Sequence, residues 1–156
     1  MKMKSVLMNN RKKAYEIVTE KGDRFIFPYS QQQPNPTSDN KIVDLYIDKE
    51  LGNEGFTYIL KDGSEGAVLM DFILEYNRDP DYMRDMLLYE LSLKAQKQLE
   101  KSKYSKREII RRLGTSPAQF YRLVDQTNYT KSVDQMLNLL QALDWEVEFI
   151  IHDNSA

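Results

Sequence analysis

The sequence contains no cysteine and only one histidine, His152, close to its end. Without cysteine the chain can form no disulfide, and it offers neither a thiol nucleophile nor a cysteine-based zinc site. With one histidine, a transition-metal site would need a cluster of carboxylates, and none stands at the spacing of ligands on a helix. We therefore expect no metal, no cofactor and no enzymatic activity.

Long apolar runs are missing as well. No stretch approaches the ~20 apolar residues of a membrane-spanning helix, and the residues after Met1 form no apolar signal core. Hydrophobic residues make up 41% of the 156 positions and charged residues 29%, which is typical of a globular protein. We expect a cytoplasmic protein with one ordinary domain or two small ones, and no membrane partner.

Charge is distributed unevenly along the chain. The net charge is only −2, yet residues 92–131 contain ten Lys or Arg against three Asp or Glu, a local charge of +7. Residues 132–156 contain five acidic residues and no Lys or Arg. A basic segment of this kind is either a solvated helix face or a surface that meets a phosphate backbone.

The first half of the chain alternates short β-rich segments with turn residues. The candidate strands are residues 5–9, 14–19, 24–29, 41–48, 56–60 and 67–70. Turn-forming residues at 20–23 and 61–66 predict hairpins, and a short helix is expected at 72–76. We predict a small antiparallel β-rich domain over residues 1–80, used for dimerisation or for binding a partner or a ligand.

Helical periodicity dominates the second half. Residues 81–102 carry an apolar row at a spacing of four, formed by Met83, Leu87, Leu91, Ala95 and Leu99. A further helix is expected over 132–143, capped by Ser132. Residues 145–152 alternate as a strand, which would pair with the N-terminal sheet or with its own copy in a dimer. The predicted class is α+β: the β-rich domain, then an all-α bundle over 81–156 with a C-terminal strand.

The most informative stretch is residues 105–124, SKREIIRRLGTSPAQFYRLV. Gly114 can adopt the left-handed conformation that ends a helix. Ser116 can cap a second helix, and Pro117 then occupies the first helical position, where proline is tolerated. Apolar residues recur at helical spacing before the turn, at Ile109, Ile110 and Leu113. A helix, a short turn with glycine and a second helix make up the helix-turn-helix unit.

This stretch resembles the helix-turn-helix of the lambda-repressor/Cro-like, or xenobiotic-response-element, family of bacterial regulators. The resemblance covers residues 92–143 and is carried by residues 105–108, the Leu-Gly-Thr-Ser turn at 113–116, and the Phe-Tyr-Arg of 120–122. The family usually has Ala where this chain has Ile110, a larger residue that would widen the crossing of the two helices. The N-terminal part weakly resembles small β-rich bacterial domains of unknown function, which implies no activity.

The resemblance implies that the second helix of the motif reads DNA. Side chains at the N-terminal end of such a helix reach base edges in the major groove. The expected base-reading residues are Pro117, Ala118, Gln119, Tyr121 and Arg122. Hydroxyl and basic side chains around them are expected to contact phosphates, which positions the protein without specifying sequence. These residues are Ser105, Lys106, Arg107, Arg111, Arg112, Ser116, Thr130 and Lys131.

We therefore expect a sequence-specific regulator that binds double-stranded DNA and represses transcription as a homodimer. The surfaces expected to form the dimer are the start of the 81–102 helix, at 82–86, and the strand expected at 145–151. Two alternatives stay open from the sequence. The chain can be an antitoxin whose N-terminal domain holds a toxin protein, or a protein-interaction module whose helical bundle has no specific DNA site.

Overall fold

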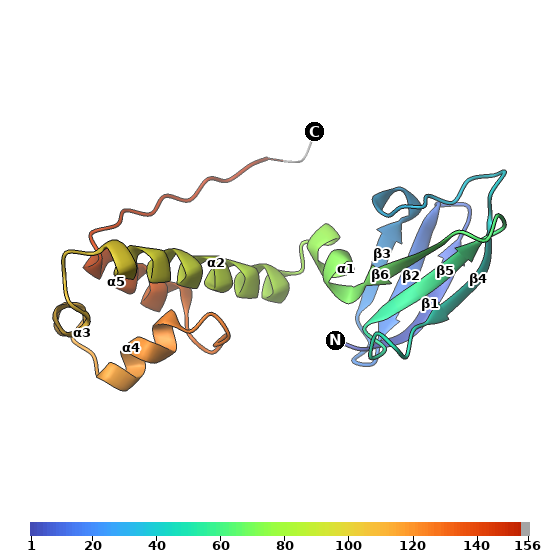
Figure 1. Cartoon of the computed structure of the whole chain (residues 1–156). Helices are drawn as coiled ribbons and strands as arrows, with labels where there is room; N and C mark the ends of the chain where they lie inside the picture. The colour runs from blue at the N-terminus through green and yellow to red at the C-terminus, as the bar shows by residue number, and fades with distance from the viewer. Residues whose placement is uncertain (154–156) are drawn as a thin grey trace. The chain divides into compact units, whose positions relative to one another are not determined.

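The computed structural model describes residues 1–153, which divide into two compact units. The first unit is Met1–Tyr82 and the second begins at Met83, and Figure 1 shows the elements of each. All strands of the described residues lie within the first unit, between residues 3 and 69. The helices follow from Met70 onward, so that the units have different architectures and are described separately.

The first unit contains two three-stranded antiparallel sheets, with strand orders β1-β2-β3 and β4-β5-β6. The strands are β1 (Met3–Asn9), β2 (Ala14–Thr19), β3 (Arg24–Pro28), β4 (Ile42–Ile47), β5 (Gly55–Leu60) and β6 (Glu65–Leu69). A 3-10 turn, η1 (Tyr29–Gln31), follows β3, and helix α1 (Met70–Tyr76) follows β6 directly. The sequence predicted all six strands, but it did not indicate that they form two sheets rather than one.

Aromatic side chains from the two central strands join the sheets into one core. The ring of Tyr15 on β2 lies 4.7 Å from that of Phe56 on β5, and 4.7 Å from that of Tyr29. Tyr58 on β5 is fully buried beside them, and its hydroxyl donates a hydrogen bond of 2.7 Å to the carbonyl of Pro34. This bond fastens the polar 31–40 loop to the core. Burial of such rings is a large source of stability for a unit of this size.

The second unit is all α-helical in the residues described. Its helices are α2 (Pro80–Lys101, which begins at the end of the first unit), α3 (Lys106–Leu113), α4 (Pro117–Val124) and α5 (Val133–Ala142). Each helix contributes buried apolar side chains to one core: Leu88, Leu91, Ala95, Ile109, Phe120, Leu123, Met136, Leu139, Leu140, Ala142 and Leu143. Helix α2 also buries Ser92, a polar residue outside the predicted apolar row.

The predicted α+β class is confirmed, whereas the C-terminal strand predicted at 145–152 is not formed in the single chain. Residues 145–152 form neither strand nor helix, although their side chains alternate as those of a strand do. The physical reason is that a strand needs a neighbouring strand for its backbone groups, and residues 83–153 contain no other strand. No helix in the described part of the chain has the length and apolarity needed to cross a membrane.

Candidate nucleic-acid interface

Helix α3 begins and ends where its sequence places capping residues. The hydroxyl of Ser105 accepts a hydrogen bond of 3.1 Å from the backbone N–H of Glu108, as an N-cap does. At the other end Gly114 has φ 66°, a left-handed conformation that costs little only for glycine. The chain then reverses over residues 113–116 and enters α4.

Helix α4 is fixed by the same chemistry. The hydroxyl of Ser116 accepts from the N–H of Gln119 at 3.2 Å, and Pro117 occupies the first turn. Phe120 is fully buried and Leu123 nearly so, because both face the core shared with α3 and α5. The structure therefore has the helix, turn and helix expected from the sequence, with the turn between them bounded by the predicted Gly114 and Ser116.

Four of the five predicted base-reading residues form one exposed face of α4. Pro117, Ala118, Tyr121 and Arg122 are exposed, and the side chain of Tyr121 is 53% accessible. They follow the i, i+1, i+4, i+5 spacing, which places them on one side of a helix. We call these four residues the α4 face. It carries one charge, that of Arg122.

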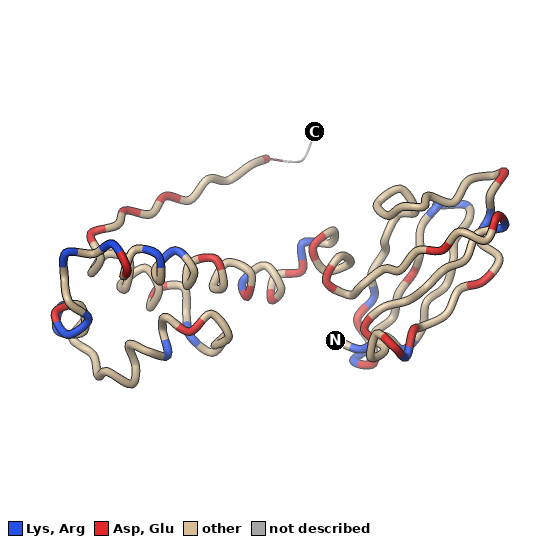
Figure 2. The backbone as a smooth tube through the Cα atoms, in the orientation of Figure 1, with Lys and Arg blue, Asp and Glu red and all other residues tan. Residues whose placement is uncertain are grey.

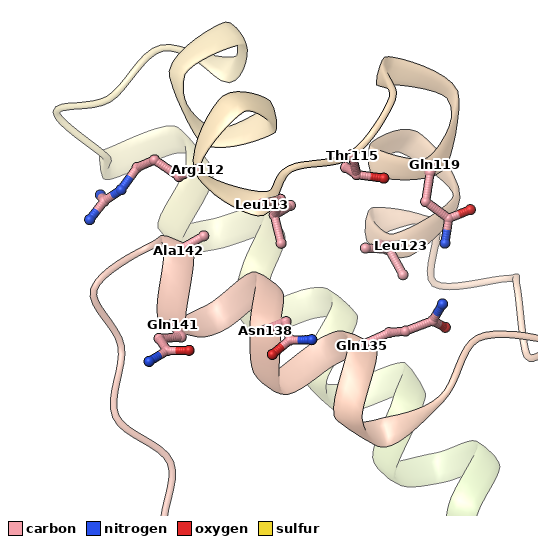
Figure 3. Close-up of a pocket in the computed structure, with 9 residues that line it drawn as sticks. All are labelled: Arg112, Leu113, Thr115, Gln119, Leu123, Gln135, Asn138, Gln141 and Ala142. Atoms are coloured by element: carbon pink, nitrogen blue, oxygen red, sulfur yellow. The ribbon is translucent and has the colours of Figure 1, made fainter.

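Gln119 lies on the flank of this face and is only half-exposed. It lines a groove between α4 and α5, together with Thr115 from the turn and Gln135 and Asn138 from α5 (Figure 3). Figure 3 shows the amides of Gln119 and Gln135 on opposite walls of this groove. The two α5 amides were not among the sequence candidates, because only the packed structure brings that side of α5 next to α4.

Arg122 is held in place by the loop that follows α4. Its guanidinium donates to the hydroxyl of Thr130 at 3.3 Å. Asn128 connects the two residues, since its amide donates to the carbonyl of Arg122 at 3.0 Å and its oxygen accepts from the Thr130 hydroxyl at 2.6 Å. The structure thus brings Thr130, a predicted phosphate contact, beside Arg122, a predicted base reader.

The start of α3 lies close to the α4 face. The Lys106 ammonium is 5.9 Å from the ring centre of Tyr121, a cation–π distance. Ser105, Lys106 and Arg107 are all exposed there. The first turn of a helix also presents unpaired N–H groups and the positive end of the helix dipole, both of which favour a phosphate.

Arg111 and Arg112, near the end of α3, already have partners within the protein. Arg111 forms a two-pronged ion pair with Glu108, with Nε 2.9 Å from a carboxylate oxygen, and this pairing holds the pKa of Glu108 below its usual value. Arg112 is 3.1 Å from the carboxylate of Asp144 and 4.2 Å from the ring centre of Tyr104. Both arginines remain exposed, so that a phosphate would compete with a surface ion pair of small strength.

Lys131 does not fit the phosphate-contacting set. Its side chain is buried, with 6% of the residue exposed, and its ammonium donates to the Ser92 hydroxyl and to the carbonyls of Leu123 and Asp125. These three acceptors use all three N–H groups of an ammonium. Desolvation by burial lowers the pKa of Lys131. We therefore remove Lys131 from the expected phosphate contacts and assign it a structural role.

The other basic residues of the segment stay at the surface. Of the ten Lys and Arg in residues 92–131, nine are exposed and Lys131 is the exception. Figure 2 shows most of them along the second half of α2 and around α3, with Arg122 on α4, whereas the tail over residues 144–153 carries only acidic charges. Among residues 1–153 no group of carboxylates or histidine is placed to hold a metal ion. The chemistry available at this surface is hydrogen bonding, stacking and positive charge.

Comparison of the chain with protein-family models, with curated proteins and with solved structures found no match in any of the three. The assignment of a function therefore depends on the site itself: on the capped helix pair, the α4 face and the basic residues beside it.

Proposed function

We propose that the protein is a sequence-specific regulator that binds double-stranded DNA through its second unit and represses transcription as a dimer. One observation carries the proposal. Helix α4 is buried on the side of Phe120 and Leu123 and exposes a short, mostly uncharged face that ends in Arg122. A helix of this kind fits a major groove, where uncharged and bidentate side chains contact base edges.

The surroundings of the α4 face support this use. Lys106 at the start of α3 lies beside Tyr121, and Arg107 follows it at the surface, so that both can meet the phosphates of a duplex on the α4 face. Thr130 lies beside Arg122, but its N–H and its hydroxyl both donate to Asn128, so it orients Arg122 rather than donating to a phosphate. The Ser116 hydroxyl accepts from a backbone N–H, which leaves its own proton to donate to a phosphate oxygen. In this arrangement Arg122 reads a guanine or a neighbouring phosphate, and Pro117 and Ala118 make apolar contacts, as with a thymine methyl group.

The nearly uncharged α4 face also favours a second candidate function. Tyr121 is exposed beside Pro117 and Ala118, and tyrosine is common at the centres of protein interfaces. In this alternative the helical bundle packs against a partner protein, and its basic residues form a solvated surface that contacts no nucleic acid. An antitoxin that represses its own operon would combine both uses, with DNA on the second unit and a toxin on the first.

The experiment that separates these functions is selection of binding sites from a random duplex library with the full chain. The proposed function predicts that one sequence is enriched and binds ~10³-fold or more tightly than a scrambled duplex of equal length. Enrichment of no sequence, with equal weak binding to all duplexes, would favour the protein-interaction alternative.

A further inference from the structure

Residues 146–152, after α5, have the sequence of a strand but no strand beside them in the described part of the chain. Asp144 has φ 62°, and the N–H of Trp145 bonds the carbonyl of Leu140 at 2.9 Å, which ends the helix. In the following seven residues, 146–152, no backbone hydrogen bond to another element is present within the described chain. Phe149, Ile150 and Ile151 are 63%, 79% and 93% exposed. Three consecutive exposed apolar side chains of this size are unusual on the surface of a monomeric protein.

Residues 146–152 have the composition and the alternation of a β-strand that has not paired with another strand. Val147, Phe149 and Ile151 alternate on one face, and all three are β-branched or aromatic, as strands favour. Val147 already packs partly against the helical core, which anchors the start of the segment. An unpaired strand presents a row of free N–H and C=O groups that another strand can use.

We propose that this segment pairs with the same segment of a second copy, as an antiparallel two-stranded ribbon whose two-fold axis passes through Phe149. A two-fold contact is self-complementary, so each pairing of residues occurs twice. In this register Phe149 faces Phe149 of the second copy and Val147 faces Ile151. On the other face Glu146 lies opposite His152, and Glu148 lies opposite Ile150.

Charge disfavours several competing registers. A two-fold centre at Glu148 would place that carboxylate opposite itself, and a centre at Val147 would place Glu146 opposite Glu148 twice. Parallel pairing in register would oppose every glutamate to its own copy. Like charges directly opposite are destabilising. A shift by one residue would put the apolar face of one strand on the polar face of the other. The Phe149 centre avoids all of these contacts and pairs all seven residues, whereas a centre at Ile150 would pair only residues 148–152.

The absence of cysteine makes the register directly measurable by cross-linking the otherwise unchanged full chain. Phe149→Cys places two thiols opposite each other across the axis, at the ~5 Å between Cα atoms that a disulfide spans. Mild oxidation without DNA should convert most of this variant to a covalent dimer. Val147→Cys and Ile151→Cys are matched controls. Each thiol would lie ~13 Å from its own copy, so both single variants should stay uncross-linked.

The double variant Val147→Cys with Ile151→Cys should cross-link again, because these two positions face each other between copies. Failure of Phe149→Cys to cross-link would overturn the proposal, as would equal cross-linking of the single controls. Light scattering provides a second readout: the wild type should have the mass of a dimer at tens of micromolar, and Phe149→Glu that of a monomer. The proposal does not depend on DNA binding, since every arm is measured without DNA.

Discussion

Lys131 and Ser92 are 39 positions apart in the sequence, and their side chains are joined by a hydrogen bond inside the helical unit. The Ser92 hydroxyl in turn donates a hydrogen bond of 2.7 Å to the carbonyl of Leu88. The Lys131 ammonium also binds the carbonyls of Leu123 and Asp125, at 2.8 and 2.7 Å. The loop after α4 is thus tied to α2 and to the end of α4, the helix that carries the proposed recognition face.

Replacement of this buried lysine should destabilise the fold. Lys131→Met leaves the Leu123 and Asp125 carbonyls without their donor, and we expect a loss of ~1–3 kcal/mol in the free energy of unfolding. Urea denaturation of the full chain measures it, with the exposed Lys97→Met as a control that should change stability by less than ~0.5 kcal/mol. A smaller effect for Lys131 than for Lys97 would contradict the structural role.

The same lysine should make stability depend on pH. Its pKa in the folded state lies below the ordinary value of 10.5, because burial disfavours the charged form. Between the two pKa values the unfolded chain binds more protons, so stability rises with pH in that window and falls as pH drops through the folded pKa. As the pH rises toward 10.5, the unfolding free energy of wild type should therefore increase relative to that of Lys131→Met, which lacks the titrating group. An unchanged difference across this range would show that the folded pKa is not lowered.

The Ser116 cap should act on stability and on DNA affinity without changing site preference. Ser116→Ala removes the acceptor for the N–H of Gln119, which should cost ~0.5–2 kcal/mol of stability. Affinity should fall in the same proportion for a selected duplex and a scrambled one, since positioning is lost rather than base contact. Ser105→Ala, the equivalent cap of α3, is the matched variant, and titration of both duplexes reveals any preference. A loss confined to the selected duplex would mean that Ser116 reads bases.

Arg122 and Arg111 should differ in the pattern of their effects. Arg122→Ala should cost ~1–3 kcal/mol on the selected duplex and much less on the scrambled one, because a base contact is lost. Arg111→Ala should weaken binding to both duplexes alike. It should also reduce the slope of log affinity against log salt by about one, as expected when one phosphate contact is lost. Gln119→Ala should affect preference less than Arg122→Ala, since Gln119 faces the groove with Gln135. Unchanged preference in Arg122→Ala would favour the protein-interaction function.

Local chemistry explains what the sequence could predict. Gly114, Ser116 and Ser132 mark helix ends through a left-handed backbone conformation or through hydrogen bonds within three residues, so these three boundaries were predictable. Ser105 also caps a helix, but it was expected only as a phosphate contact. These ends, with the buried Phe120, also placed four of the five base-reading candidates on one face.

The remaining features depend on residues distant in the chain. Lys131 is buried only because Ser92 and two carbonyls surround it, and a lysine in a polar loop gives no local sign of this. Gln119 lines a groove that only the neighbouring α5 completes, and the two sheets meet through contacts such as that of Tyr15 on Phe56, between residues 41 positions apart. The alternation of residues 145–152 indicated a strand but could not supply its neighbour.

The salt dependence of DNA binding tests the central claim most directly. The segment 92–131 has nine exposed basic residues, and six to ten phosphate contacts would lose ~10³–10⁵ in affinity between 50 and 200 mM salt. Fluorescence anisotropy of a labelled duplex, titrated with the full chain at several salt concentrations, measures the slope. We predict a steep linear fall of log affinity with log salt for any duplex, and in Lys131→Met, with its buried cation removed, the same slope as in wild type. A flat dependence, or no binding at 50 mM salt, would contradict the account.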